Sequence, residues 1–236
     1  MFQAEYYYVI GAGGIGSWLL LPLIRTLVND NFNIKYLQIW DGDKYEENNS
    51  SRQEFAYSLI GRNKAEAQTI LYTKRYGEKI NILAMSKYIS KDNVCTLKDK
   101  CVIFSCVDNH VCRKILSNHA KTLNNILFIS GGNELYDGNV QVYYKEQGHE
   151  VIPPIENRHP EIVTTDDGDR SQMSCEEIAN LPGGGQIIVT NLIAATLMFN
   201  LWYVYTHYPM NGKWINEVFF DTKTLRFTRI INNIPD

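Results

Sequence analysis

The sequence lacks the marks of several broad protein classes. Its five cysteines are an odd number and include no C-x-x-C pair, which argues against a disulfide framework and a structural zinc site. The net charge is only −3, without a basic cluster, which excludes a strongly basic nucleic-acid-binding protein. There are no repeats or low-complexity tracts, and residues 1–10 are too short and aromatic for a signal peptide. We therefore expect a globular cytoplasmic protein that binds neither nucleic acid nor membrane.

Acidic and basic residues are also missing from the whole segment between Gly183 and Gly212. A segment of this length could span a membrane as a helix of about 20 residues. No Lys or Arg flanks its start, however, and polar residues are scattered through it: Thr190, Asn191, Thr196, Asn200 and Thr206. We interpret the segment as a helix buried in the core rather than as a membrane span.

Short apolar runs alternate with helical patterns through the first 132 residues. Strands are predicted at 6–10, 34–40, 81–85, 101–107 and 126–130, where Gly131 and Gly132 end the last one, and helices at 14–28, 62–76 and 111–123. This alternation is typical of an α/β, Rossmann-like fold, in which helices cover both faces of a mostly parallel sheet. Further on, 137–144, 214–221 and 225–231 predict C-terminal antiparallel strands, and about 150–175 a loop.

A glycine-rich turn, GAGGIG, lies between the first predicted strand and the first predicted helix. Gly11, Gly13 and Gly16 fit the pattern G-x-G-x-x-G, which lets the backbone approach a phosphate at a helix N-terminus. Asp41 ends the next strand, where a carboxylate can accept a hydrogen bond from a ribose hydroxyl. These features predict a nucleotide site, but they suit NAD, FAD and ATP alike.

The residues after the second strand distinguish these nucleotides. Polar side chains gather there in the segment DGDKYEENNSSRQEF, namely Asp41, Asp43, Asn49, Arg52 and Gln53. Arg52 and the later Lys64 would place positive charge over a polyphosphate. Asp108, after the fourth strand, could hold Mg²⁺ against phosphate oxygens. This combination favours ATP over NAD.

The order of these motifs resembles the ThiF/MoeB family of ubiquitin-activating-type adenylating enzymes. The resemblance implies that Gly11, Gly13, Gly14 and Gly16 form the phosphate cradle, and that Asp41 binds the ribose. It also implies that Asn49, Arg52 and Lys64 contact the phosphates, that Asp43 and Gln53 belong to the same site, and that Asp108 holds the metal. The stretch HPEI…DD…SC is most similar to the plasmid-associated PRTRC-system branch, and Cys175 in it is the implied acceptor cysteine.

The family resemblance implies one adenylation domain over residues 1–236, with a nucleotide-binding half (1–132) and a partner-binding half (133–236). Its expected activity is adenylation of the C-terminal carboxylate of a small ubiquitin-like (β-grasp) protein, with ATP and Mg²⁺, in a homodimer. Transfer of the acyl group to Cys175 would follow. Because the arginine of the family's N-terminal arm has no counterpart here, a catalytically weak nucleotide-binding adaptor stays as an alternative. An NAD-dependent oxidoreductase is the third interpretation.

Overall fold

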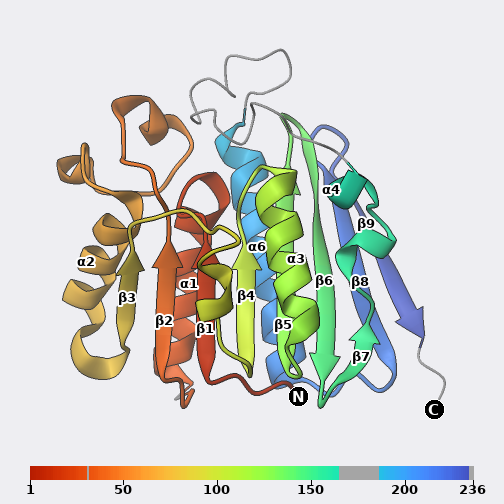
Figure 1. Cartoon of the computed structure of the whole chain (residues 1–236). Coiled ribbons are helices and arrows are strands. Elements are labelled where there is room, and N and C mark those ends of the chain that lie inside the picture. Colours follow the sequence, from red (N-terminus) through yellow and green to blue (C-terminus); the bar gives the residue numbers. More distant parts are fainter. Residues whose placement is uncertain (31, 165–185, 234–236) are drawn as a thin grey trace.

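The computed structural model describes residues 1–30, 32–164 and 186–233. Its centre is a nine-stranded mixed sheet (Figure 1). The strands are β1 (Tyr6–Ile10), β2 (Tyr36–Trp40), β3 (Ile82–Met85), β4 (Cys101–Ser105), β5 (Ile126–Asn133), β6 (Asp137–Glu146), β7 (His149–Ile152), β8 (Lys213–Asp221) and β9 (Arg226–Asn233). The α-helices are α1 (Gly14–Asn29), α2 (Lys64–Tyr76), α3 (His110–Thr122), α4 (Glu161–Thr164) and α6 (Ile188–His207).

The strand order is β3-β2-β1-β4-β5-β6-β8-β9, with β7 paired to β6. The first five strands in this order, β3-β2-β1-β4-β5, are parallel to one another. Strands β6, β7, β8 and β9 are joined to the sheet by antiparallel pairs. The predicted α/β architecture with C-terminal antiparallel strands is therefore confirmed. The chain order reverses direction between β1 and β4, so the carboxyl ends of these two neighbours form the place where open α/β sheets bind ligands.

The sheet is buried on both faces, as the apolar strand sequences predict. In β1, Tyr7 and Val9 face the core under α1 and α6, whereas Tyr8 and Ile10 face the core under α3. Figure 1 shows α3 in front of the sheet and α1 and α6 behind it. This layering confirms the expected cover of helices on both faces.

The charge-free segment forms helix α6, which packs against α1 and β5. Within the described ranges it is the one helix long and apolar enough to cross a membrane by length and composition. Its polar Thr190 and Asn191 are fully buried, as is Trp202, whose indole lies against Tyr7 of β1. Along this side the helix therefore belongs to the core of the sheet.

The structure corrects two details of the sequence interpretation. Strand β5 does not stop at Gly131 and Gly132 but runs through both, since they pair with Val140 and Asn139 of β6. Glycine is needed there for packing: a Cβ on Gly131 would lie 2.4 Å from the sulfur of Met198. The expected loop also contains β7, a 3-10 turn at Ile155–Asn157 and the short helix α4. Cys175 lies outside the described residues.

Candidate nucleotide site

The glycine turn follows β1 at the carboxyl edge of the sheet. Gly11 has a φ of +93°, and a Cβ there would lie 2.9 Å from the carbonyl oxygen of Cys106. A Cβ on Gly16 would lie 1.9 Å from the carbonyl oxygen of Gly11, so neither position accepts a side chain. Helix α1 begins after Gly13 without a side-chain cap. Its first amide groups are therefore available to an anion, which the helix dipole also attracts.

Asp41 connects the end of β2 to this turn. Its Oδ2 accepts a hydrogen bond of 2.7 Å from the amide of Ala12, and its Oδ1 accepts one of 2.8 Å from the amide of Asp43. Burial raises the pKa of Asp41 to about 6, against the opposing effect of the nearby Lys64 charge. Each carboxylate oxygen has a further lone pair, so the group can still accept a hydroxyl donor such as a ribose.

Lys64, the first residue of α2, is almost completely buried at this edge. Its Nζ lies 3.3 Å from Oδ2 of Asp43, and the side chain is 2% exposed. The hydroxyl of Tyr88 also contacts Asp43, and the ring of Tyr88 packs on Gly42, where a Cβ would lie 2.6 Å away. The structure thus brings Asp41, Asp43 and Lys64 together beside the glycine turn, with Asp41 and Lys64 buried and Asp43 partly exposed.

The loop after β2 places Arg52 and Gln53 over the start of α1. The Arg52 carbonyl accepts hydrogen bonds of 3.1 Å from the indole of Trp18 and of 3.1 Å from Nδ2 of Asn191 on α6. Gln53 is buried against Gly13, and its Oε1 has no hydrogen-bond partner among the described residues. An orphaned buried amide oxygen beside a phosphate-type cradle fits a site that a ligand completes.

Asn49 has a local structural use that the sequence did not indicate. Its Oδ1 accepts the amide of Glu46 and its Nδ2 donates to Asn48, which shapes the 3-10 helix Glu47–Ser51. The side chain is 2% exposed. Its contact with phosphate stays a prediction.

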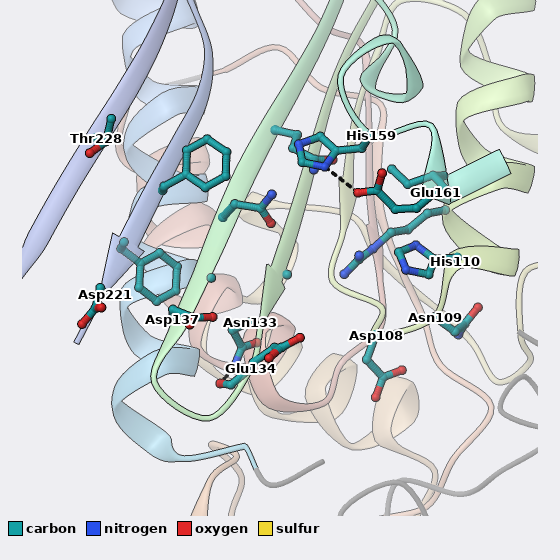
Figure 2. A pocket seen from close by; sticks show the side chains of 18 of the residues that line it. Asp108, Asn109, His110, Asn133, Glu134, Asp137, His159, Glu161, Asp221 and Thr228 are labelled. Atoms are coloured by element: carbon teal, nitrogen blue, oxygen red, sulfur yellow. Dashed lines mark hydrogen bonds and ion pairs between the residues drawn. The ribbon is translucent and has the colours of Figure 1, made fainter. Parts of the chain in front are cut away.

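Asp108 follows β4 at the same edge. Strand β4 pairs with β1, and the amide of Cys106 donates to the carbonyl of Ile10 at 2.8 Å, so Asp108 comes two residues after a direct contact with the strand that carries the glycine turn. Asp108 is exposed and lines a pocket of about 650 Å³ (Figure 2). The other walls of this pocket come from the β5–β6 turn, β6, β8, β9, α3 and α4. Asp108 therefore lies near the strand that carries the glycine turn and also lines this pocket.

Within the described ranges, no three His, Cys, Asp or Glu residues are grouped so that they could hold a metal ion. Mg²⁺ commonly uses one or two carboxylates together with substrate phosphates and water. Asp108 fits that mode of binding, because its carboxylate is exposed beside the edge where phosphates would lie.

The sequence profile described as the ThiF family matches residues 3–227, nearly the whole chain. This chain belongs to the ThiF family. No curated protein matches this chain. The expected resemblance is thereby confirmed at the level of the family.

Solved structures share the ThiF fold seen here. PaaA superimposes with a TM-score of 0.67 at 17% identity, covering 98% of this chain and 65% of that one. E. coli MccB with ATP gives 0.67 at 16%, covering 98% and 64%. E. coli MccB with AMPCPP and MccA gives 0.68 at 15%, covering 97% and 64%. This ThiF chain thus spans about 64–65% of the length of these neighbours.

Two groups in this ThiF chain hold the backbone of this edge through contacts that the sequence analysis did not predict. The hydroxyl of Tyr45 donates to the carbonyl of Ala12 at 3.1 Å and accepts from Nε2 of Gln68 at 2.7 Å. These bonds connect the glycine turn to helix α2. Arg113 donates to the carbonyls of Val107 and Gly131, which links the ends of β4 and β5. No sequence motif predicts the contacts of Tyr45 and Gln68 with the glycine turn. Arg113 lies close to Asp108 in sequence, and this is the one local sign that it belongs to the same edge.

A third group is buried beside the pocket. Glu217 of β8 has a side chain 1% exposed and accepts bonds from Nε2 of His159 at 2.7 Å, Nε of Arg158 at 3.1 Å and Nδ2 of Asn139 at 2.8 Å. Burial alone would raise the pKa of Glu217, but these donors hold it below its usual value. The bond to Glu217 raises the pKa of His159. Since His159 and Glu217 are 58 residues apart, no sequence pattern could have joined them.

Proposed function

We propose that this ThiF family member activates a carboxylate of a polypeptide substrate by ATP-dependent adenylation. The position of Asp108 carries the proposal. The residue follows β4, the neighbour of the strand that ends in the glycine turn, and it lines the separate pocket of Figure 2. A nucleotide on the turn and a substrate in the pocket would meet at this carboxylate.

The described residues suit each part of ATP. The uncapped start of α1 and the glycine turn offer backbone amides to the phosphates, and Asp41 offers acceptors to the ribose. Lys64 lies beside Asp43, and Arg52 belongs to the loop over the start of α1, so both would supply positive charge to the phosphates. Asp108 would hold Mg²⁺, which would neutralise phosphate charge. This donor set is richer in positive charge than a dinucleotide of the NAD type needs.

Adenylation requires no side chain to act as an acid or a base at the substrate carboxylate. An oxygen of the substrate carboxylate forms a bond to the α-phosphorus, and the bond from that phosphorus to its bridging oxygen breaks, releasing pyrophosphate. No proton moves in this step. The protein therefore contributes by positioning the two reactants and by stabilising charge with Lys64 and Arg52.

The fold alone does not determine the substrate, the acceptor residue, the assembly or the location of the protein. We propose the C-terminus of a small ubiquitin-like protein as the substrate, transfer of its acyl group to Cys175, a homodimer, a cytoplasmic location and membership of the PRTRC-system branch. Support for a polypeptide substrate comes from MccB, which was crystallised with AMPCPP together with selenomethionine-labelled MccA. The neighbours compared are at most 17% identical to this chain, so the ubiquitin-like identity of the substrate rests on the family resemblance and not on them.

ATP–pyrophosphate exchange tests the proposal. The chain is incubated with Mg²⁺, ATP, labelled pyrophosphate and candidate small proteins that have a free C-terminus, such as those encoded beside it. We expect exchange that requires Mg²⁺ and is lost in Asp108→Ala, while Asp92→Ala, which removes another exposed carboxylate, keeps it. Retained exchange in Asp108→Ala would contradict the site. Tight ATP binding without exchange would support the adaptor alternative, and tight NADH binding the oxidoreductase.

A further inference from the structure

The pocket beside Asp108 is strongly acidic. Its lining contains five carboxylates against two arginines. In the view of Figure 2, Asp108, Glu134, Asp137 and Asp221 lie along one side, and His159 and Glu161 lie on the other. The pocket is open to solvent on the acidic side, since Asp108, Glu134 and Asp137 are all exposed.

Several charged groups of the pocket already have partners. Glu161 accepts from His159 at 2.7 Å, and the Arg113 guanidinium donates to two carbonyl groups. Asp221 uses Oδ1 to accept the amides of Lys223 and Thr224 in the β8–β9 turn. Within the described part of the chain, Glu134 and Asp137 form no ion pair. They are joined through their backbones, since the amide of Glu134 donates to the carbonyl of Asp137 at 2.9 Å.

The sheet register adds a direct repulsion at this place. Asp137 of β6 and Asp221 of β8 are cross-strand partners. Like charges directly opposite each other destabilise a sheet. On its other side Asp221 is paired with Arg226 of β9, which also lines the pocket, and Lys223 of the turn lies 3.6 Å over the ring of Tyr136. Asp137, at the end of β6, has no such cation among its cross-strand partners in the described sheet. A cation bound between the strand ends would relieve this repulsion.

Gln141 supplies an independent sign of a ligand. It lies on β6 in the pocket wall and is 6% exposed. Its side-chain amide makes no hydrogen bond with any described residue and is open to the pocket, so a ligand there can reach it. The amide can both donate and accept, as a peptide group requires. Phe219 of β8 lines the same wall and offers an apolar surface to an alkyl chain.

We propose that this pocket binds a basic side chain, Lys or Arg, of the substrate close to its C-terminal carboxylate. The alkyl stem packs on Phe219, the charged group reaches Glu134 and Asp137, and Gln141 binds the adjacent peptide group. Long basic side chains commonly place their stems on apolar surface and their charge at a polar rim. This inference rests on the proposed function for the placement of the carboxylate at Asp108.

Peptide selection tests the pocket without relying on catalysis. The full chain is used to select from octapeptides with randomised sequence and a free C-terminal carboxylate, in the absence of ATP. We expect enrichment of Lys or Arg within the last few positions. A selected lysine peptide should bind roughly fivefold more tightly than its norleucine analogue in fluorescence anisotropy, as expected for exposed ion pairs. The advantage should shrink as salt is raised.

Three double variants separate this pocket from a general charge effect. Glu134→Gln/Asp137→Asn should abolish the preference for lysine over norleucine, whereas Glu78→Gln/Asp92→Asn, with the same change in net charge outside the pocket lining, should keep it. Glu134→Lys/Asp137→Lys should shift the preference to acidic peptides. Equal binding of lysine and norleucine peptides, or no selection at all, would overturn the inference. Pyrophosphate exchange with norleucine peptides as good as with lysine peptides would also overturn it, and would leave adenylation intact. Lysine-selective binding without exchange would support the pocket and contradict the proposed function.

Discussion

The carboxylate of Asp41 accepts a hydrogen bond of 2.7 Å from the backbone amide of Ala12. This bond holds the glycine turn after β1 against the end of β2, and it places a buried negative charge next to the proposed phosphate cradle. The position of the glycine turn therefore depends on the Asp41 carboxylate, and three variants at this edge test that dependence.

The contact between Gly16 and Gly11 predicts the first result. Because a Cβ on Gly16 would lie 1.9 Å from a backbone oxygen, Gly16→Ala should lower the free energy of unfolding by about 3 kcal/mol or more and abolish ATP binding. Gly77→Ala is the control, since that glycine has a φ of +61° and no neighbour within 4 Å. With ψ at −137° its backbone lies in a region that L residues rarely adopt, so this change should cost about 1–3 kcal/mol and leave ATP affinity unchanged. Urea denaturation and calorimetric titration measure both, and equal effects of the two variants would contradict the packing argument.

The raised pKa of Asp41 predicts opposite pH trends for stability and for binding. Between its usual value of 3.8 and about 6, the folded state binds a proton that the unfolded chain does not. The contribution of Asp41 to the free energy of unfolding should therefore rise as pH falls from 7 to 5. ATP affinity should fall over the same range, because a protonated carboxyl is a poorer acceptor for the ribose.

The matched variant for this pH effect is Asp41→Asn. Comparing denaturation and ATP titrations of the two proteins from pH 5 to 8 cancels the titration of ATP itself. Both pH trends should be smaller in Asp41→Asn, and Asp92→Asn should behave like the parent chain. If the parent and Asp41→Asn show the same pH dependence, Asp41 does not titrate in this range.

The buried charge of Lys64 predicts a coupled change. Lys64→Met keeps a long side chain but removes the cation beside Asp43. ATP should bind at least tenfold more weakly, by roughly 1.4 kcal/mol. Since Lys64 lowers the pKa of Asp41, the midpoint of the Asp41 pH effect should also move upward. Lys74→Met, in the last turn of α2, is the control. An unchanged midpoint would place Lys64 too far from Asp41 to act on it.

The bond between His159 and Glu217 predicts a pH-dependent stability. The pKa of His159 is raised, so its contribution is complete below its usual value of 6.5 and is lost as pH rises through the higher folded value. The pKa of Glu217 is lowered, so its contribution is lost only in acid. His159→Gln should therefore cost about 1–2 kcal/mol at pH 6 and clearly less at pH 9. His149→Gln, on β7, serves as the control. A cost of His159→Gln that is the same at both pH values would contradict an ionic role.

The sequence predicted the elements well because their signals are local. Apolar runs marked β1 and β4, and the GAGGIG turn marked the strand-to-helix junction. The sequence prediction ended β5 before Gly131 and Gly132, because glycine usually weakens or ends a strand. Glycine is required at these two positions because a side chain there would collide with Met198 and Arg113, which are distant in sequence. Such packing leaves no local pattern.

The candidate site was predicted in part for the same reason. Asp41, Asp43 and Lys64 lie together beside the glycine turn, and Asp108 follows β4 at the edge where the sequence placed it. The capping role of Asn49 and the support of the turn by Tyr45 could not be predicted, because both depend on where a loop folds back. The roles of the site residues toward ATP stay predictions.

Asn191 of helix α6 ties the two halves of the chain together. It donates to the carbonyl of Arg52, 139 residues earlier, accepts from Asn133 at the end of β5, and occupies the space that a Cβ on Gly14 would need. Residues 1–132 alone would therefore not make an autonomous nucleotide-binding module. Splitting the gene at that point should yield two fragments that regain ATP affinity only when they are combined.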